Sequence, residues 1–334
     1  IYTKGTVNMT GGVIAANHAN AGGGVYVDGG NVDISSGAVA GNWVNDGHNS
    51  GGGIYVSSGT LNLSDNGYVT NNYKNECCTN DINNNHGGGG IALAGSSEMN
   101  MSGGYVTGNY SGLAGGGIYA GFFGGSASFA MSGGTIASNC AEQGEGGGLR
   151  VAGGTNAVIS ASTEKAYITN NITKTPDDWG GGGIFVQQYG NLNIMNALIT
   201  KNSAGGYGGG VAACPTGETL IVSTEGAAIY QNSDEGQNMS DGGNGKNADS
   251  AIAQKDPVFT QNGHSDYFCV RSEKDNPISL VTGEMVGGGA ANWTGSCDGK
   301  YIEISKSGYA VANYLFGLKA EPNQSDIDAA KKVT

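Results

Sequence analysis

A short alternating apolar segment recurs through most of the chain, each time directly after a run of glycines. In each segment two apolar residues flank a central residue, as in Val25-Tyr26-Val27 and Ile54-Tyr55-Val56. The glycine runs begin at residues 22, 51, 87, 115, 146, 180 and 208, so the segments return every 28 to 36 residues. Such short alternation predicts β-strands with one buried face.

Two further patterns follow the first segment in most repeats. The second segment places Asn or Asp between two apolar residues, as in Val7-Asn8-Met9 and Leu61-Asn62-Leu63. The third segment ends in an asparagine three residues after Val or Ile. These asparagines are Asn17, Asn42, Asn72, Asn109, Asn139, Asn171, Asn202 and Asn232. Each repeat therefore reads as three short strands separated by Gly, Ser and Asn turns.

A repeat of this size cannot bury its apolar face alone, so successive repeats must pack on one another. The chain is predicted to be all-β, a right-handed parallel β-helix: a solenoid with three strands per coil and about 8–10 coils. The asparagines are expected to form a buried ladder in which each amide bonds to the next coil. Glycine would allow positive φ at tight corners and close approach of neighbouring coils.

The repeat weakens after residue 232. Regular coils are expected over 1–232, and degenerate coils with a C-terminal cap over 233–334, because the last coil of such a fold leaves an unpaired edge. A strand is expected at 267–270, and a short helix begins near Ser325, which has an acid at its third helical position. The chain opens in the middle of a coil at Ile1, so we expect a piece of a longer protein.

The amino-acid composition reduces the classes of partner that the chain can bind. The 334 residues include 64 glycines, which the repeat explains, and only 15 Lys and Arg against 28 Asp and Glu, a net charge of −13. Binding to nucleic acid needs a cationic surface that displaces phosphate counterions, so this class is excluded. The sequence has no apolar run of membrane-spanning length, so direct membrane insertion is not expected.

The glycine and asparagine motifs carry a family resemblance. Gly-Gly-Gly-Ile-Tyr-Val at 51–56, combined with Val-x-x-Asn at 69–72, resembles the β-helical passenger repeats of bacterial surface proteins. It is similar to the polymorphic outer-membrane-protein repeat, although Val or Ile stands here where that family has Phe. The resemblance covers 1–232, with a weaker match at 287–313. It implies a pectin-lyase-like fold, an extracellular or bacterial cell-surface location, and an adhesin.

The same fold also hosts polysaccharide lyases and hydrolases, which need converging carboxylates. Asp33 lies between Asn8 and Asn62 of the neighbouring repeats, and most other acids fall in turns. The sequence contains no stacked pair of carboxylates. A non-enzymatic protein without cofactor or metal is therefore favoured, and a carbohydrate-active enzyme on the same fold is the alternative.

The repeats are compatible with two further functions. A structural spacer, whose binding domains lie elsewhere, would use the same repeats without a ligand. An ice-binding face is suggested by one outward threonine per repeat, at Thr70, Thr107, Thr169 and Thr200. Ala40 and Ala137 interrupt that row, so ice binding is disfavoured.

Aromatic side chains recur at two positions of the repeat. The central residues of the first segments are expected to form an exposed stripe: Tyr2, Tyr26, Tyr55, Ala92, Tyr119, Arg150, Phe185 and Ala212. A second row follows the asparagines: His18, Trp43, Tyr73, Tyr110 and Cys140. Such rows arise from β-propensity and stacking on a solvated face. They also suit a platform for sugar rings or a protein partner.

Loop length varies most between each asparagine and the next glycine run. Insertions gathered on one edge are typical of a binding edge. A host glycan or a secreted or surface host protein is therefore expected to bind around 42–50 and 72–86. The candidate ligand-binding residues are Trp43, His48, Tyr73, His86, Tyr110, Trp179, Tyr26, Tyr55 and Tyr119.

The chain has six cysteines, and an even number in an exported protein suggests disulfides. Cys77 or Cys78 lies on the same edge as Cys140, and Cys269 is a plausible partner of Cys297. The sequence does not fix this connectivity. A zinc site is a rival interpretation, although C-x-x-C spacing is lacking. Its ligands would be His48, His86 and Cys77 or Cys78.

Overall fold

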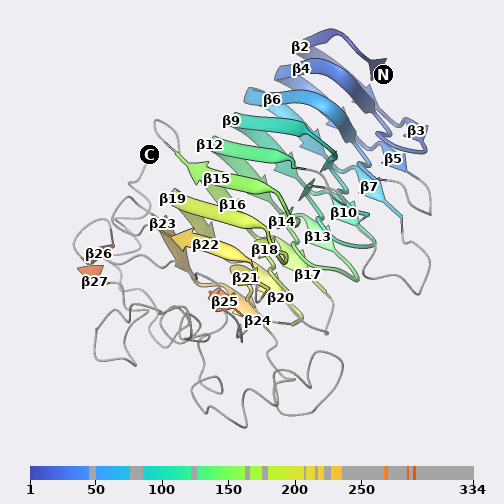
Figure 1. The fold of residues 1–334 in the computed structure, drawn as a ribbon. Helices are drawn as coiled ribbons and strands as arrows, with labels where there is room; N and C mark the ends of the chain where they lie inside the picture. Colours follow the sequence, from blue (N-terminus) through green and yellow to red (C-terminus); the bar gives the residue numbers. More distant parts are fainter. Residues whose placement is uncertain are drawn as a thin grey trace.

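The structure is a computed structural model of the chain. It describes residues 1–44, 50–75, 86–121, 126–161, 166–174, 180–206, 208–214, 217–221, 227–234, 267–269, 284–285 and 289–290. Every regular element in these ranges is a β-strand (Figure 1), so the predicted all-β class is confirmed. The helix expected near Ser325 lies outside the described residues.

The 27 strands of the described residues fall into three groups and one separate pair. Strands that begin at the first segment are β1 (Tyr2–Thr3), β4 (Val25–Ala40), β6 (Ile54–Thr70), β8 (Ile91–Leu93), β11 (Ile118–Ala120), β14 (Leu149–Val151), β18 (Ile184–Val186), β21 (Val211–Ala213) and β25 (Tyr267–Cys269). Strands of the later segments are β2 (Thr6–Ala15), β9 (Ser97–Thr107), β12 (Ser128–Ala137), β15 (Asn156–Ser160), β16 (Ala166–Thr169), β19 (Asn191–Thr200), β22 (Glu218–Ile221) and β23 (Ala227–Tyr230). Strands directly after the asparagines are β3 (His18–Ala19), β5 (Trp43–Val44), β7 (Tyr73–Lys74), β10 (Tyr110–Ser111), β13 (Cys140–Ala141), β17 (Ile172–Thr173), β20 (Ser203–Ala204) and β24 (Ser233–Asp234). The separate antiparallel pair is β26 (Glu284–Met285) and β27 (Gly289–Ala290).

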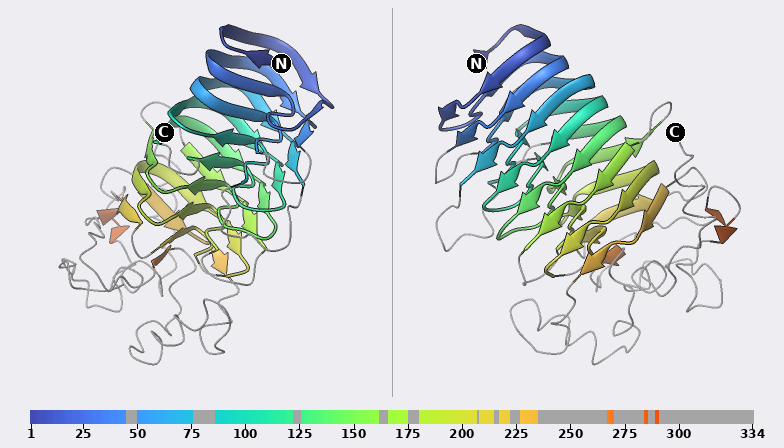
Figure 2. Two further views of the ribbon diagram at one scale, coloured as in Figure 1. Left: turned by 45° about the vertical axis from the view of Figure 1, so that its right-hand side comes forward. Right: turned by 180° about the vertical axis from the view of Figure 1, so that it is seen from behind.

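Neighbouring repeats pair in parallel, with equivalent residues opposite each other and register shifts at local irregularities between the segments. In β4 and β6 the three predicted segments merge into single long strands, which pair from Val25 opposite Ile54 to Ala40 opposite Thr70. In the described residues the first two groups form one 17-stranded sheet, and the strands after the asparagines form a separate 8-stranded sheet. The views of Figures 1 and 2 agree that the repeats follow one another side by side along the molecule.

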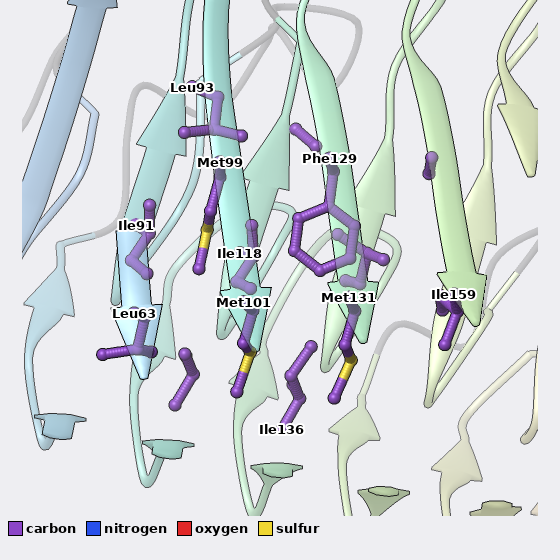
Figure 3. Packing of buried hydrophobic residues seen from close by; sticks show 14 of the residues in the cluster. Leu63, Ile91, Leu93, Met99, Met101, Ile118, Phe129, Met131, Ile136 and Ile159 are labelled. Atoms are coloured by element: carbon purple, nitrogen blue, oxygen red, sulfur yellow. The ribbon is translucent and has the colours of Figure 1, made fainter. Parts of the chain in front are cut away.

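The inner side chains of these strands form one apolar core. The apolar residues on the inner side of the second repeat are all buried, and they are Val25, Val27, Val32, Ile34 and Val39. Figure 3 shows later members of the core, where Met101 and Met131 occupy equivalent positions of neighbouring repeats beside Phe129. Each repeat thus buries its apolar residues against its neighbours.

The predicted asparagine ladder is confirmed. The backbone N–H and the side-chain Nδ2 of Asn72 both donate to Oδ1 of Asn109, each at 3.0 Å. Asn72 Nδ2 also donates to the Val39 carbonyl at 2.9 Å. The same pattern links Asn17 through to Asn232 across the described repeats. The amides are buried at the inner repeats, and these bonds satisfy their polar atoms.

Each of the three glycines before a first segment is required for a different structural reason, as residues 51–53 show. Gly51 adopts φ 70°, a left-handed conformation that costs glycine little. A Cβ on Gly52 would lie 2.4 Å from the carbonyl oxygens of both Gly89 and Tyr73. A Cβ on Gly53 would lie 2.8 Å from the Asn72 side chain. The glycines therefore allow a tight corner of the chain, a close approach of neighbouring backbones, and space for the ladder asparagines.

The residues after each asparagine differ from the sequence prediction. We expected loops there, but the structure has two-residue strands such as β5 and β7, which pair in register as Trp43 opposite Tyr73. Two residues are too few to show an alternating pattern, so sequence periodicity misses these strands. The strand expected at 267–270 is present as β25 and pairs with β21. The division at residue 232 stays a prediction, because most of 233–334 lies outside the described residues.

Candidate functional site

The 8-stranded sheet brings three predicted ligand-binding residues into one row. Trp43 lies opposite Tyr73, and Tyr73 lies opposite Tyr110, so the three occupy one position in successive repeats. His18 precedes them opposite Trp43. We call these four residues, His18, Trp43, Tyr73 and Tyr110, the aromatic ladder. The structure thus confirms that residues from four separate repeats share one edge.

The first three rings of the aromatic ladder, those of His18, Trp43 and Tyr73, stack on one another. The ring centroids of His18 and Trp43 are 5.0 Å apart, and those of Trp43 and Tyr73 are 5.9 Å apart with an interplanar angle of 8°. Tyr73 is 37% exposed. Because stacked neighbours cover part of each other's faces, the ladder offers solvent mainly ring edges and polar tips. Edges carry partial positive charge and suit hydrogen-bond acceptors.

The other predicted row, the stripe of first-segment residues, is exposed only at its first end. Tyr2 is 62% exposed, and its ring lies 5.5 Å from that of Tyr26, which in turn lies 5.0 Å from Tyr55. Tyr26 and Tyr55 are half-buried. Tyr119 is fully buried, so the expectation that it is an exposed ligand-binding residue was wrong.

Tyr119 is buried by residues outside its own strand. Its ring packs with Ala92, Ala114 and Ala152 in a small second core, with Tyr55 beside it. Ala114 belongs to the segment between an asparagine and the next glycine run, so that segment folds back over the outer side of the first strands. The sequence pattern within β11 contains no signal of this cover.

The same covered row contains a buried cation. The side chain of Arg150 is 6% exposed, and its Nε lies 3.1 Å from a carboxylate oxygen of Glu145. Its guanidinium lies 4.8 Å from the ring centroid of Tyr119 and 5.9 Å from that of Phe185, and Nη1 donates to the Tyr119 hydroxyl. Burial raises the pKa of Tyr119, and the Arg150 charge opposes this shift.

Sequence reasoning missed this network of Arg150, Tyr119 and Glu145. The available signal was the single charged residue in a row that is otherwise aromatic or alanine. A charge between two aromatic rings is stabilised by cation–π attraction when it is desolvated. The network therefore ties the segment that contains Glu145 to the outer side of β14 and β11.

We expect Arg150→Ala to lower the free energy of unfolding by roughly 3 kcal/mol, because it removes one partner of a buried ion pair. Arg150→Leu should cost less, since leucine fills part of the space between the rings. Chemical denaturation followed by circular dichroism measures both. Lys174→Ala is the control: Lys174 is 52% exposed, pairs with Glu142 at 2.8 Å, and should cost less than about 1 kcal/mol. Equal losses for Arg150 and Lys174 would contradict this account.

The outward side of the second segments is rich in amides and carboxylates. Asp33 accepts hydrogen bonds from Asn31 at 2.7 Å and from Asn62 at 2.6 Å, and Asn100 donates to Glu98 at 2.9 Å. We call these five residues the amide face. The nearest outward neighbours of Asp33 along the stack are Asn8 and Asn62, as expected. Within the described residues, no three His, Cys, Asp or Glu gather into a metal-binding group.

The remaining predicted residues are only partly placed. His86 is buried directly before the Gly87 run. Cys140 is half-buried, and burial raises the pKa of its thiol. Cys269 lies on β25, where the backbone alone is described. The disulfide and zinc predictions stay untested, because their other members lie outside the described residues: His48, Cys77, Cys78 and Cys297. Trp179 lies outside them too.

Comparison with known proteins places the chain in no family: no family model, curated protein or solved structure matches it. Among the described elements there is no helix long and apolar enough to cross a membrane. The functional argument therefore rests on the faces of the repeats themselves. Of these, the aromatic ladder is the row in which three predicted binding residues meet and none of the three is fully buried.

Proposed function

We propose that the repeats form a right-handed parallel β-helix, a solenoid in which each repeat makes one coil. Three observations support this architecture: in-register parallel pairing between successive repeats, a continuous apolar core and a continuous asparagine ladder. Right-handed crossovers are the general rule for parallel strands. A rod of this kind presents the same side-chain position at regular steps of about 4.8 Å.

We propose further that the chain is a non-enzymatic, adhesin-like segment of an extracellular or bacterial cell-surface protein. Its partner would be a host glycan or a secreted host protein, bound along the edge that holds the aromatic ladder. The observation that carries this proposal is the meeting of Trp43, Tyr73 and Tyr110 in one solvent-facing row. The segments of most variable length follow directly after this row in the sequence, which is typical of a binding edge.

Binding of the chain to arrays of host glycans and to purified mucosal proteins tests the proposal. We expect Trp43→Ala and Tyr73→Ala to weaken binding about tenfold or more, as buried aromatic contacts do in interfaces. Tyr68→Ala is a matched control, because Tyr68 and Tyr73 are both 37% exposed but lie on different faces. Equal loss with Tyr68→Ala would contradict a site on the aromatic ladder.

Two results would favour a different function. Turnover of a polysaccharide that is lost in Asp33→Asn would support a carbohydrate-active enzyme on the same fold, because a neutral amide cannot act as a general base. A chain that binds no glycan and no host protein would support a structural spacer. In either case the adhesin-like function is overturned, whereas the proposed β-helix is not.

A further inference from the structure

One outward face of the repeats carries no charge. It consists of the two outward positions of the third segments, on either side of an inward Val or Ile. We call it the uncharged face, and over six successive repeats it is Val13, Ala15, Ala38, Ala40, Tyr68, Thr70, Tyr105, Thr107, Thr135, Ala137, Tyr167 and Thr169. All of these residues are exposed or half-buried, and Val13 is 68% exposed.

Two other outward surfaces of the described repeats carry charged residues. The amide face contains Asp33 and Glu98, and the first-segment side contains the ion pair of Lys4 and Asp28 at 3.3 Å. The net charge of −13 makes two copies repel each other at long range. The uncharged face is therefore an outer surface on which two copies can meet without bringing carboxylates together.

The uncharged face also alternates between large and small side chains along the repeats. Tyr68 and Tyr105 stack with ring centroids 4.6 Å apart and an interplanar angle of 10°, so they form one projecting ridge. The repeats on either side of this ridge carry small residues, Ala38–Ala40 before it and Thr135–Ala137 after it. A ridge bordered by two shallow stretches can pack against an inverted copy of the same surface.

From the charge pattern and this relief, we propose that the uncharged face is a self-association surface that binds a second copy of this chain. Two copies related by a two-fold axis would pack these sheet faces against each other at the usual spacing of about 10 Å. Six repeats about 4.8 Å apart give a face that buries on the order of 400 Å² per copy. This is below the roughly 800 Å² per partner of stable complexes, so the dimer is weak and reversible.

Analytical ultracentrifugation from micromolar to millimolar protein tests this proposal, with Thr70→Glu as the disrupting variant. We expect the unchanged chain to form dimers at high concentration, and Thr70→Glu to weaken dimerisation at least about tenfold by placing like charges opposite each other. Added salt should strengthen the dimer of the unchanged chain, because it screens the repulsion of two acidic molecules. An association held by ion pairs would weaken instead.

Thr60→Glu provides the matched control. Thr60 lies on the same strand, β6, is half-buried like Thr70, and is paired with Asn31 and Glu98 on the amide side. This variant adds the same charge but should leave dimerisation unchanged. If Thr70→Glu fails to fold, Ala137→Glu on β12 makes the same test. A chain that stays monomeric at all concentrations would overturn the proposal. An equal loss of dimerisation with Thr60→Glu would overturn it too, as would the finding that Thr70 binds a different partner.

Discussion

Asn109→Ala should lower the free energy of unfolding by roughly 4 kcal/mol, because it breaks the asparagine ladder near its centre. The substitution removes the acceptor for two donors of Asn72 and the donor to the Val69 carbonyl. All three groups are buried, and each unsatisfied group costs roughly 1–3 kcal/mol. Chemical denaturation followed by circular dichroism measures the loss, and amide hydrogen exchange should show it concentrated in the adjoining repeats.

Asn100→Ala is the matched control for this experiment. Asn100 lies on β9, the strand that ends just before Asn109, and donates to Asn62 at 3.1 Å and Glu98 at 2.9 Å on the half-exposed amide face. Water can replace these bonds, so the expected loss is below about 1 kcal/mol. Equal losses for Asn109 and Asn100 would refute the view that the buried ladder carries this stability.

Gly52→Ala should be at least as damaging as the loss of one ladder amide. The added Cβ would lie 2.4 Å from the carbonyl oxygens of Gly89 and Tyr73, and both are backbone atoms that cannot move aside alone. Forcing them apart should cost roughly 3 kcal/mol or more, with an accompanying loss of soluble protein. Thermal unfolding and yield of folded chain measure the effect.

Gly11→Ala tests whether this cost comes from contact or from glycine content itself. Gly11 lies in β2, where an added Cβ would meet no atom within 4 Å. Its replacement should be neutral or should stabilise the protein by up to about 1 kcal/mol through the unfolded state. A destabilisation of Gly11→Ala comparable with that of Gly52→Ala would mean that close backbone approach does not explain the glycine runs.

Sequence predicts best those structural features whose residue pattern recurs at the same position in every repeat. Val25 and Val27 are recognisable as inward residues because alternation within a short strand decides which face is buried. Asn72 is recognisable because a polar residue recurs at a fixed position after an inward Val or Ile. The repetition thus makes both the core residues and the ladder asparagines recognisable from the sequence alone.

The features that sequence misses depend on contacts between different repeats. Tyr119 follows the same pattern as Tyr26, yet Tyr119 is buried and Tyr26 is half-exposed. The difference comes from Ala114 and the neighbouring Ala92 and Ala152, which lie in other segments. For the candidate site, the row of Trp43 and Tyr73 was predictable, whereas the orientation of its rings was not. Stacking geometry depends on side-chain packing, and a one-dimensional pattern does not contain it.

The asparagine ladder has a direction. In the described repeats each Asn donates to Oδ1 of the following one, from Asn17 to Asn42 and onward to Asn232. The amide dipoles therefore add along the axis, as peptide dipoles add along a helix, and hydrogen bonds in such chains polarise one another. The two ends of the ladder are chemically unlike, because every bond between two ladder amides has its donor on the Asn17 side and its acceptor on the Asn232 side. A segment that packs on the Asn17 end of the ladder would therefore meet a different arrangement of hydrogen-bonding groups from one that packs on the Asn232 end.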